Sequence, residues 1–152
     1  FPDGGPDGEG TTNGHRFQHV SVGNPQCSIR IADRDELEQL DLPRIGPGIE
    51  HDPQFPNRTN VSFWTEIGPG RIRARIFERG VGETMSSGTG ASGAAVAYAL
   101  RGGDSPVTVV LDGGELEVEV GEDLHVDLTG WAVPVYAAEL APEFVRELEQ
   151  CA

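Results

Sequence analysis

The sequence predicts an α+β fold in which a curved, mostly antiparallel sheet surrounds a central buried helix. Segments with strand-like alternation of apolar residues lie on both sides of residues 88–100. Between them, residues 90–100 carry no charge and are small and apolar on every side. A helix without a polar face is typically buried all round. We therefore expect a helix over residues 88–100 that is enclosed by the strands.

The predicted strands are short, contain β-branched or aromatic residues, and are bounded by Gly, Pro, Asn or Asp. They comprise residues 15–22, 27–31, 60–66, 71–77, 107–111, 115–120, 125–129 and 131–137. A Gly-Pro-Gly turn separates the third and fourth, and an Asp-Gly-Gly turn separates the fifth and sixth, so both pairs are expected to form hairpins.

Helix signals are fewer. Residues 33–40 form a short charged segment with Asp33 or Asp35 as a candidate N-cap. Residues 142–150 are amphipathic and begin with a proline, which the first helical position tolerates. Residues 43–58 contain so many Pro and Gly residues that no regular structure is expected there.

The length of 152 residues is sufficient for one domain. Residues 1–14 are rich in Gly and Pro and predict a flexible linker, followed by a single domain over residues 15–152. The chain opens on Phe1 without a Met and without a charged and apolar leader, so we expect a piece of a longer protein with no signal peptide. No apolar run reaches the roughly 18 residues that a membrane span needs.

The formal charge is −14, and all 11 basic residues are arginines. A negative surface repels phosphate groups, which excludes nucleic acids and anionic membranes as expected partners. A zwitterionic amino acid would not be repelled. Cys27, Cys151 and the histidines show no metal-ligand spacing, so no metal site is expected. Reduced thiols favour a cytoplasmic location.

The most informative motif covers residues 78–91, which read ERGVGETMSSGTGA. This run resembles the signature of diaminopimelate epimerases, in which E-R-G-x-G-E-T is followed after a short spacer by C-G-T-G-A. Residues 22–27, VGNPQC, resemble the G-N-P-H-C segment of that family, and residues 55–61 contain its F-P and T-N-V motifs. The D-G-G-E-L and L-T-G motifs follow in order, so the resemblance extends over residues 20–136.

The resemblance implies the carboxyl-terminal domain of an isomerase that epimerises diaminopimelate, a precursor of lysine and peptidoglycan. The family works without cofactors, including pyridoxal phosphate, and binds substrate between two similar domains. Its implied partners are therefore a small amino-acid substrate and its own N-terminal domain, with a homodimer left open. One cysteine from each domain faces the α-carbon; one thiolate removes the proton and the other thiol supplies one on the opposite face.

Site residues follow from the same resemblance. Gly88 and Thr89 would hold the α-carboxylate at the helix N-terminus, where free N–H groups and the helix dipole favour an anion. Four polar residues would hold the far end of diaminopimelate: Asn24, Asn60, Glu78 and Arg79. Each has a structural alternative as a turn former, a helix cap or a surface charge, but the ordered set favours a binding site.

Two positions depart from the family pattern. Ser87 stands where the family has its catalytic cysteine, and Gln26 stands where a histidine is usual. A hydroxyl is far less acidic than a thiol, so this chain alone is expected to be inactive. Ser92 occupies another position where cysteine is frequent, whereas Cys27 is retained, which favours natural divergence over engineering.

Two other functions are open on the sequence. A divergent relative could bind a similar amino acid and run a one-base isomerase or dehydratase reaction, or none. A serine hydrolase is a weak hypothesis, because residues 90–94, GASGA, approach the G-x-S-x-G motif but end in alanine and have no suitably placed histidine.

Overall fold

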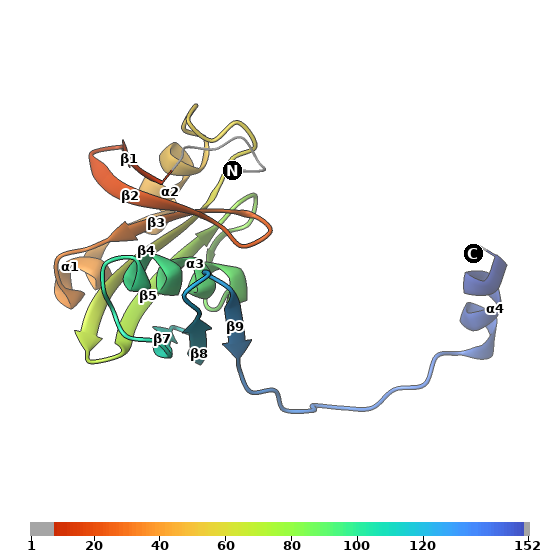
Figure 1. Ribbon diagram of the computed structural model, residues 1–152. Helices are drawn as coiled ribbons and strands as arrows, with labels where there is room; N and C mark the ends of the chain where they lie inside the picture. The colour runs from red at the N-terminus through yellow and green to blue at the C-terminus, as the bar shows by residue number, and fades with distance from the viewer. Residues whose placement is uncertain (1–7, 151–152) are drawn as a thin grey trace.

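The computed structural model describes residues 8–150 and is shown in Figure 1. Within this range nine strands form one sheet, and four helices accompany it. The strands are β1 (Glu9–Thr12), β2 (His15–Ser21), β3 (Pro25–Arg30), β4 (Asn60–Gly68), β5 (Arg71–Glu78), β6 (Gly82–Thr84), β7 (Val107–Leu111), β8 (Gly114–Val120) and β9 (Val126–Thr129). The helices are α1 (Arg34–Gln39), α2 (Leu42–Glu50), α3 (Gly88–Ala99) and α4 (Pro142–Gln150).

The strands are ordered β1-β2-β3-β4-β5-β7-β8-β9, and β6 pairs with β5 outside this path. The β3–β4 and β5–β7 pairs are parallel, and the other pairs are antiparallel. Both predicted hairpins, β4–β5 and β7–β8, are present. The prediction of an α+β fold with a largely antiparallel sheet is therefore confirmed.

The two faces of the sheet bury separate apolar clusters. Strand β4 illustrates the alternation, since Val61 and Phe63 belong to one cluster and Trp64 to the other. The first cluster includes side chains of α1 and α2, and the second includes the apolar side chains of α3. Because successive side chains of a strand point to opposite faces, β4 joins the two layers of the core.

Helix α3 contacts the strands β2, β3, β4, β5, β7, β8 and β9. Its residues from Gly90 to Tyr98 are all buried. Small side chains permit this close packing: a Cβ atom on Gly90 would lie 2.8 Å from Ile76 Cγ2, and one on Gly93 would lie 2.8 Å from Gln26 Cβ. The charge-free run in the sequence thus corresponds to a helix whose backbone lies directly against side chains of the sheet.

Helix α1 begins as its sequence predicts. Asp33 is the N-cap, and its Oδ1 accepts a hydrogen bond of 2.9 Å from the backbone N–H of Glu36. This bond satisfies one of the donors that the first helical turn leaves open.

The expectation of irregular structure over residues 43–58 is wrong, because α2 occupies the first part of this segment. Asp41 caps the helix and accepts from Arg44 N–H, and one proline lies within the first two positions, where it is tolerated. Leu42, Gly46 and Ile49 are buried at helical spacing. Burial of this apolar face outweighs the low helix propensity of the glycines and of the second proline.

The linker predicted over residues 1–14 is wrong for Glu9–Thr12, which form β1 and pair with β2. Gly10 lies against the ring of Phe17, where a Cβ atom would approach to 2.3 Å. The strand therefore depends on glycine, the residue that suggested a linker. Residues 1–7 of the predicted linker lie outside the described part of the chain.

The strand predicted over residues 131–137 is also wrong. Residues 130–141 have no regular structure and lead away from the sheet to α4 (Figure 1). Helix α4 confirms the helix predicted over residues 142–150, but all of residues 127–150 are exposed. No helix within residues 8–150 is long and apolar enough to cross a membrane.

Candidate functional site

The N-terminus of α3 is capped by Ser87, the position at which the family resemblance predicts a catalytic cysteine. Its backbone is extended (φ −147°, ψ 118°), and its Oγ accepts a hydrogen bond of 3.2 Å from Gly90 N–H. The side chain is buried, with the residue 8% exposed. Ser87 therefore has a structural function that the sequence did not indicate: it satisfies one of the free donors of the helix start.

A hollow of about 400 Å³ lies beside this first turn of α3. It is lined by Gly88, Thr89 and Ser92 of the helix, by the end of β2, and by the segment that leads into β9. A helix N-terminus that opens into a hollow can present N–H groups and a partial positive charge to an anionic ligand. His125 also lines the hollow, and no motif in the sequence had indicated it.

Asn24 is placed against this helix start. Its Nδ2 donates to Thr89 Oγ1 at 3.3 Å, and its Oδ1 accepts from Gln26 Nε2 at 2.8 Å. Gln26 is fully buried in β3. The glutamine that departs from the family pattern thus fixes the orientation of the Asn24 amide, which leaves its Nδ2 directed at α3.

Asn60 connects this region to the next strand. The parallel register of β3 and β4 places it opposite Gln26. Its Nδ2 donates to the Pro25 carbonyl at 3.2 Å, and its Oδ1 accepts from the Arg79 backbone N–H at 2.9 Å. Both ends of the buried amide bind backbone groups, so Asn60 fixes the position of the Arg79 backbone.

Glu78 and Arg79 are half-buried at the end of β5. Arg79 Nη1 donates to the Asn57 carbonyl at 2.7 Å, and Glu78 Oε1 accepts from Thr84 Oγ1 at 2.8 Å. No ion pair joins the two side chains to each other within residues 8–150. The alternative of an ordinary exposed surface pair does not describe them.

Glu50 is a positioning residue that sequence reasoning missed. It ends α2, is 4% exposed, and its Oε1 accepts from Gly80 N–H at 2.9 Å and from Arg58 Nη1 at 3.2 Å. Gly80 (φ +76°) forms the turn that follows Arg79. Glu50 was overlooked because the sequence predicted no helix in this segment.

The loop before Ser87 is held from the other side. The Gly113 N–H, in the β7–β8 turn, donates to the Met85 carbonyl at 2.6 Å. The neighbouring Asp112 pairs with Arg73, whose guanidinium also binds Glu38 at 2.7 Å. This buried arginine therefore links α1, β5 and the turn that supports the cap of α3.

The structure brings all seven predicted site residues into one connected region. Ser87, Gly88 and Thr89 form the start of α3, Asn24 bonds to Thr89, and Gln26 leads from Asn24 to Asn60. Asn60 in turn binds Arg79, which follows Glu78. Four separate segments of the chain thus meet through hydrogen bonds and strand pairing around the first turn of α3.

Neither Ser92 nor Cys27 is placed as a nucleophile. Ser92 lies inside α3 and donates to the Gly88 carbonyl at 2.9 Å, whereas a hydrolase nucleophile would lie on a sharp strand-to-helix turn. Cys27 is fully buried, and burial together with the nearby Asp52 carboxylate raises the pKa of its thiol. No group of three or more potential metal ligands occurs in residues 8–150.

Comparison with known proteins identifies a family. Residues 18–134 match the family model described as diaminopimelate epimerase. A curated diaminopimelate epimerase from Synechococcus sp. (strain JA-3-3Ab) is 46% identical over 124 residues, which cover 80% of this chain and 44% of the relative. One from Desulfovibrio desulfuricans is 47% identical over 122 residues, 79% of this chain and 42% of the relative. The chain thus spans about half the length of these relatives.

A similar fold occurs in a solved structure. The phenazine biosynthesis protein of the PhzF family from Bacillus anthracis superimposes with a TM-score of 0.50 at 22% sequence identity. The match covers 75% of this chain and 38% of that one. At this identity the likeness extends to the fold alone.

Proposed function

Because the chain belongs to the diaminopimelate epimerase family, we propose that it is the carboxyl-terminal domain of a cofactor-independent enzyme that inverts the α-carbon of diaminopimelate. The observation that supports the proposal is the α3 N-terminus, which opens into a hollow and is capped by Ser87, the residue that the resemblance places at the catalytic position. The relatives named above share this function by name, whereas the divergent one-base alternative has no comparable support.

The α-carboxylate of the substrate binds the first turn of α3 in this proposal. Gly88 and Thr89 lie there and line the hollow. The helix dipole and the free N–H groups of a first turn favour a carboxylate by about 0.3–1 kcal/mol, and more in a partly buried geometry. Asn24, held by Gln26, supplies an oriented amide beside Thr89.

The far end of the substrate would be held by Arg79, Glu78 and Asn60. A guanidinium binds a carboxylate with paired hydrogen bonds, and a carboxylate accepts from an ammonium group. Arg79 uses one nitrogen to bind Asn57 and retains other donors for a ligand. Asn60 acts chiefly through the backbone of Arg79, since both ends of its amide are engaged.

Ser87 limits the chemistry. Proton removal from an α-carbon needs a base whose pKa lies near the working pH, which a thiol near a helix N-terminus provides. The Ser87 hydroxyl is held as a cap by Gly90 N–H, and no side-chain base bonds to it among the described residues. Without such a partner a hydroxyl is a weak nucleophile and base. Proton transfer by this half of the enzyme is therefore slow.

The partner in this proposal is an N-terminal domain of the same enzyme, which would precede the domain described above. Residues 127–150 are exposed throughout and include Trp131, Val135, Tyr136 and Phe144, all at least 48% exposed. A nine-residue helix is marginal in water without tertiary contacts, and a row of exposed apolar side chains marks an interaction surface. This segment would pack on the other domain. The enzyme would be cytoplasmic, either as a monomer or as a homodimer.

The sheet would then complete a curved wall around α3, with this helix at the centre of the domain. Its contacts with seven strands and its burial from Gly90 to Tyr98 support that arrangement. Enclosure fixes the direction of the helix axis, and hence the place at which the N-terminus presents its partial positive charge.

The test is Ser87→Cys in the full-length enzyme, with Ser86→Cys as the matched control. Ser86 is adjacent but exposed and does not cap α3. Solvent-deuterium incorporation at the α-carbon of both diaminopimelate stereoisomers should rise about 10²- to 10⁴-fold for Ser87→Cys and stay unchanged for Ser86→Cys. If the Ser87→Cys enzyme binds the substrate while exchange remains at the unmodified rate, this position does not carry the proton transfer and the proposal fails.

A further inference from the structure

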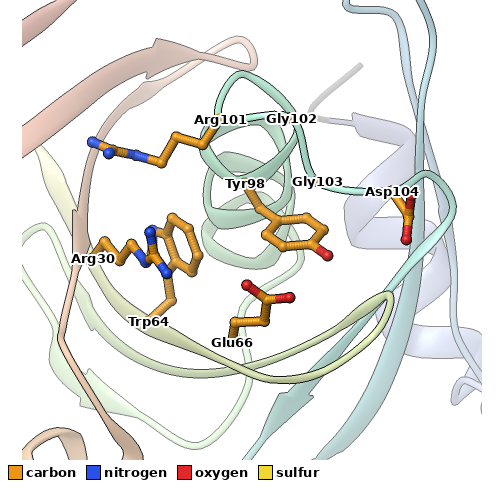
Figure 2. Close-up of a pocket in the computed structure, with 8 residues that line it drawn as sticks. All are labelled: Arg30, Trp64, Glu66, Tyr98, Arg101, Gly102, Gly103 and Asp104. Carbon is orange, nitrogen blue, oxygen red and sulfur yellow. The ribbon is translucent and has the colours of Figure 1, made fainter.

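A second cavity lies at the opposite end of α3 from the candidate active site. It has a volume of about 180 Å³ and is formed by β3, β4 and the residues that follow the helix (Figure 2). Since α3 contains 12 residues at about 1.5 Å each, the two ends are separated by about 18 Å. The cavity is therefore a separate place on the molecule, and its chemistry does not depend on the proposed activity.

One side of this cavity is positively charged. Arg30 and Arg101 line it, and both also line an adjoining hollow together with Arg16. Glu9 pairs with Arg16 at 3.2 Å and with Arg101 at 3.3 Å, so a single carboxylate serves two guanidinium groups. In a chain with a net charge of −14, this local excess of positive charge is unusual.

Arg30 itself forms no ion pair with any residue in the described range 8–150. Its guanidinium lies 5.9 Å from the ring centroid of Trp64, a cation–π distance. This contact orients the group while leaving its N–H donors free. A planar guanidinium held in this way is suited to binding a carboxylate.

Trp64 forms part of the cavity wall. The residue is 1% exposed, and its Nε1 is a buried donor without a hydrogen-bond partner in the described residues. A buried N–H that lacks an acceptor costs about 1–3 kcal/mol. Because Trp64 lines the cavity, its indole N–H signal can report on a ligand that binds there.

The other side of the cavity is negatively charged. Figure 2 shows the side chains of Arg30, Trp64 and Arg101 toward one side, Asp104 on the other, and Tyr98 and Glu66 between them. Neither Glu66 nor Asp104 is ion-paired in residues 8–150. Carboxylates accept hydrogen bonds from an ammonium group.

The wall between the charged sides is rigid. Tyr98 is 5% exposed and packs edge-on against Trp64, with ring centroids 6.0 Å apart. Gly103 lies on the tyrosine ring so closely that a Cβ atom would approach Cε1 to 2.3 Å. Its N–H also donates to the Tyr98 carbonyl at 3.1 Å. The cavity is thus built from fixed aromatic surfaces.

The geometry points to a binding site for a small zwitterionic amino acid, with its carboxylate toward Arg30 and its ammonium group toward Glu66 and Asp104. Opposite charges on the two sides favour a dipolar ligand over a simple anion. The volume is below the roughly 300–1,000 Å³ of sites for drug-sized ligands, which restricts the ligand to a few heavy atoms.

The test uses glycine as the ligand, with acetate and methylammonium as its two halves. The chain contains two tryptophans, so a ¹⁵N-labelled sample gives two indole N–H signals, and Trp131→Phe assigns them. Glycine should shift the Trp64 indole signal in a saturable manner. Each half-ligand should bind about tenfold more weakly or worse, because one set of charge-assisted hydrogen bonds is lost.

Arg30→Gln should weaken glycine binding at least about tenfold, and Glu66→Gln should weaken it in the same direction. The matched control is Arg146→Gln, because Arg146 lies in the exposed helix α4 and pairs only with Glu143 among the described residues. Urea unfolding of each variant establishes that the fold is retained.

Three results would overturn the inference. The first is a Trp64 signal that does not respond to glycine. The second is an Arg30→Gln protein that remains folded and binds as well as Arg146→Gln. The third is acetate binding as tightly as glycine, which would make the site a simple anion site.

Discussion

Removing the Glu50 side chain should loosen the turn that carries Arg79. In Glu50→Ala the Gly80 N–H loses its acceptor at 2.9 Å, and Arg58 loses its partner at 3.2 Å. A donor left without an acceptor costs about 1–3 kcal/mol, whereas the ion pair adds less than about 1 kcal/mol because Arg58 is half-exposed. We expect a loss of about 2 kcal/mol, which lowers Tm by about 4–8 °C in a chain of this size.

Glu50→Gln is the matched control for this loss. Its amide oxygen can still accept from Gly80, so only the charge interaction with Arg58 is removed and the cost should stay below about 1 kcal/mol. Urea unfolding measures both variants, and hydrogen exchange of the Gly80 amide reports on the turn itself. Exchange should accelerate in Glu50→Ala only. If Glu50→Gln costs as much as Glu50→Ala, or if exchange at Gly80 is unchanged in both, Glu50 does not hold the turn.

Three further predictions concern the supports of the site. The hydrogen bond from Arg73 lowers the pKa of Glu38 in the folded protein. The stabilisation that this bond provides is therefore complete above the unfolded pKa of about 4.3 and is lost as the pH falls through the lower folded pKa. In acid, the urea midpoint of Glu38→Gln should consequently fall less steeply with pH than that of the unmodified protein. Cys27, buried and with a raised pKa, should react with a thiol reagent only at the rate of unfolding, and faster modification of Cys27 itself in the native protein, measured separately from that of Cys151, would contradict its placement. Gly90→Ala should lower the free energy of unfolding by about 1–3 kcal/mol because the added methyl group overpacks the contact with Ile76, whereas Gly88→Ala should lower it by less than about 1 kcal/mol. Equal urea midpoints for the two variants would contradict the close contact at Gly90.

Local patterns predicted the elements that depend on local physics. The β4–β5 and β7–β8 hairpins follow from alternating strands around glycine turns, and the cap at Asp33 follows from a side chain that bonds three residues ahead. Helix α3 could be predicted because a helical segment with no charge on any face is stable only when the rest of the domain covers it. In each case, a few neighbouring residues contain the whole signal.

Burial by distant parts of the chain accounts for the elements that the sequence did not predict. Helix α2 contains Pro and Gly, and its stability comes from burial of its apolar residues, which only the folded sheet provides. The contact between Asn24 and Thr89 joins residues 65 positions apart, and the motif resemblance alone suggested that they meet. Gly10 contributed to the linker prediction because glycine is common in linkers. The reason for a glycine at this position is the ring of Phe17, which packs against it only in the folded sheet.

The failed strand prediction over residues 131–137 has a different cause. Trp131, Val133 and Val135 alternate as strand residues do, but alternation indicates a strand only where another strand offers hydrogen bonds and a core covers one face. In residues 8–150 neither is provided: all three side chains are 67–89% exposed, and the backbone has no sheet partner. The alternation alone was therefore not sufficient to predict a strand. The relative from Synechococcus sp. (strain JA-3-3Ab) is longer than this chain, since the matched 124 residues are 44% of its length. In the proposed full-length enzyme, packing of residues 131–137 on the N-terminal domain would account for an alternation that the described residues do not use.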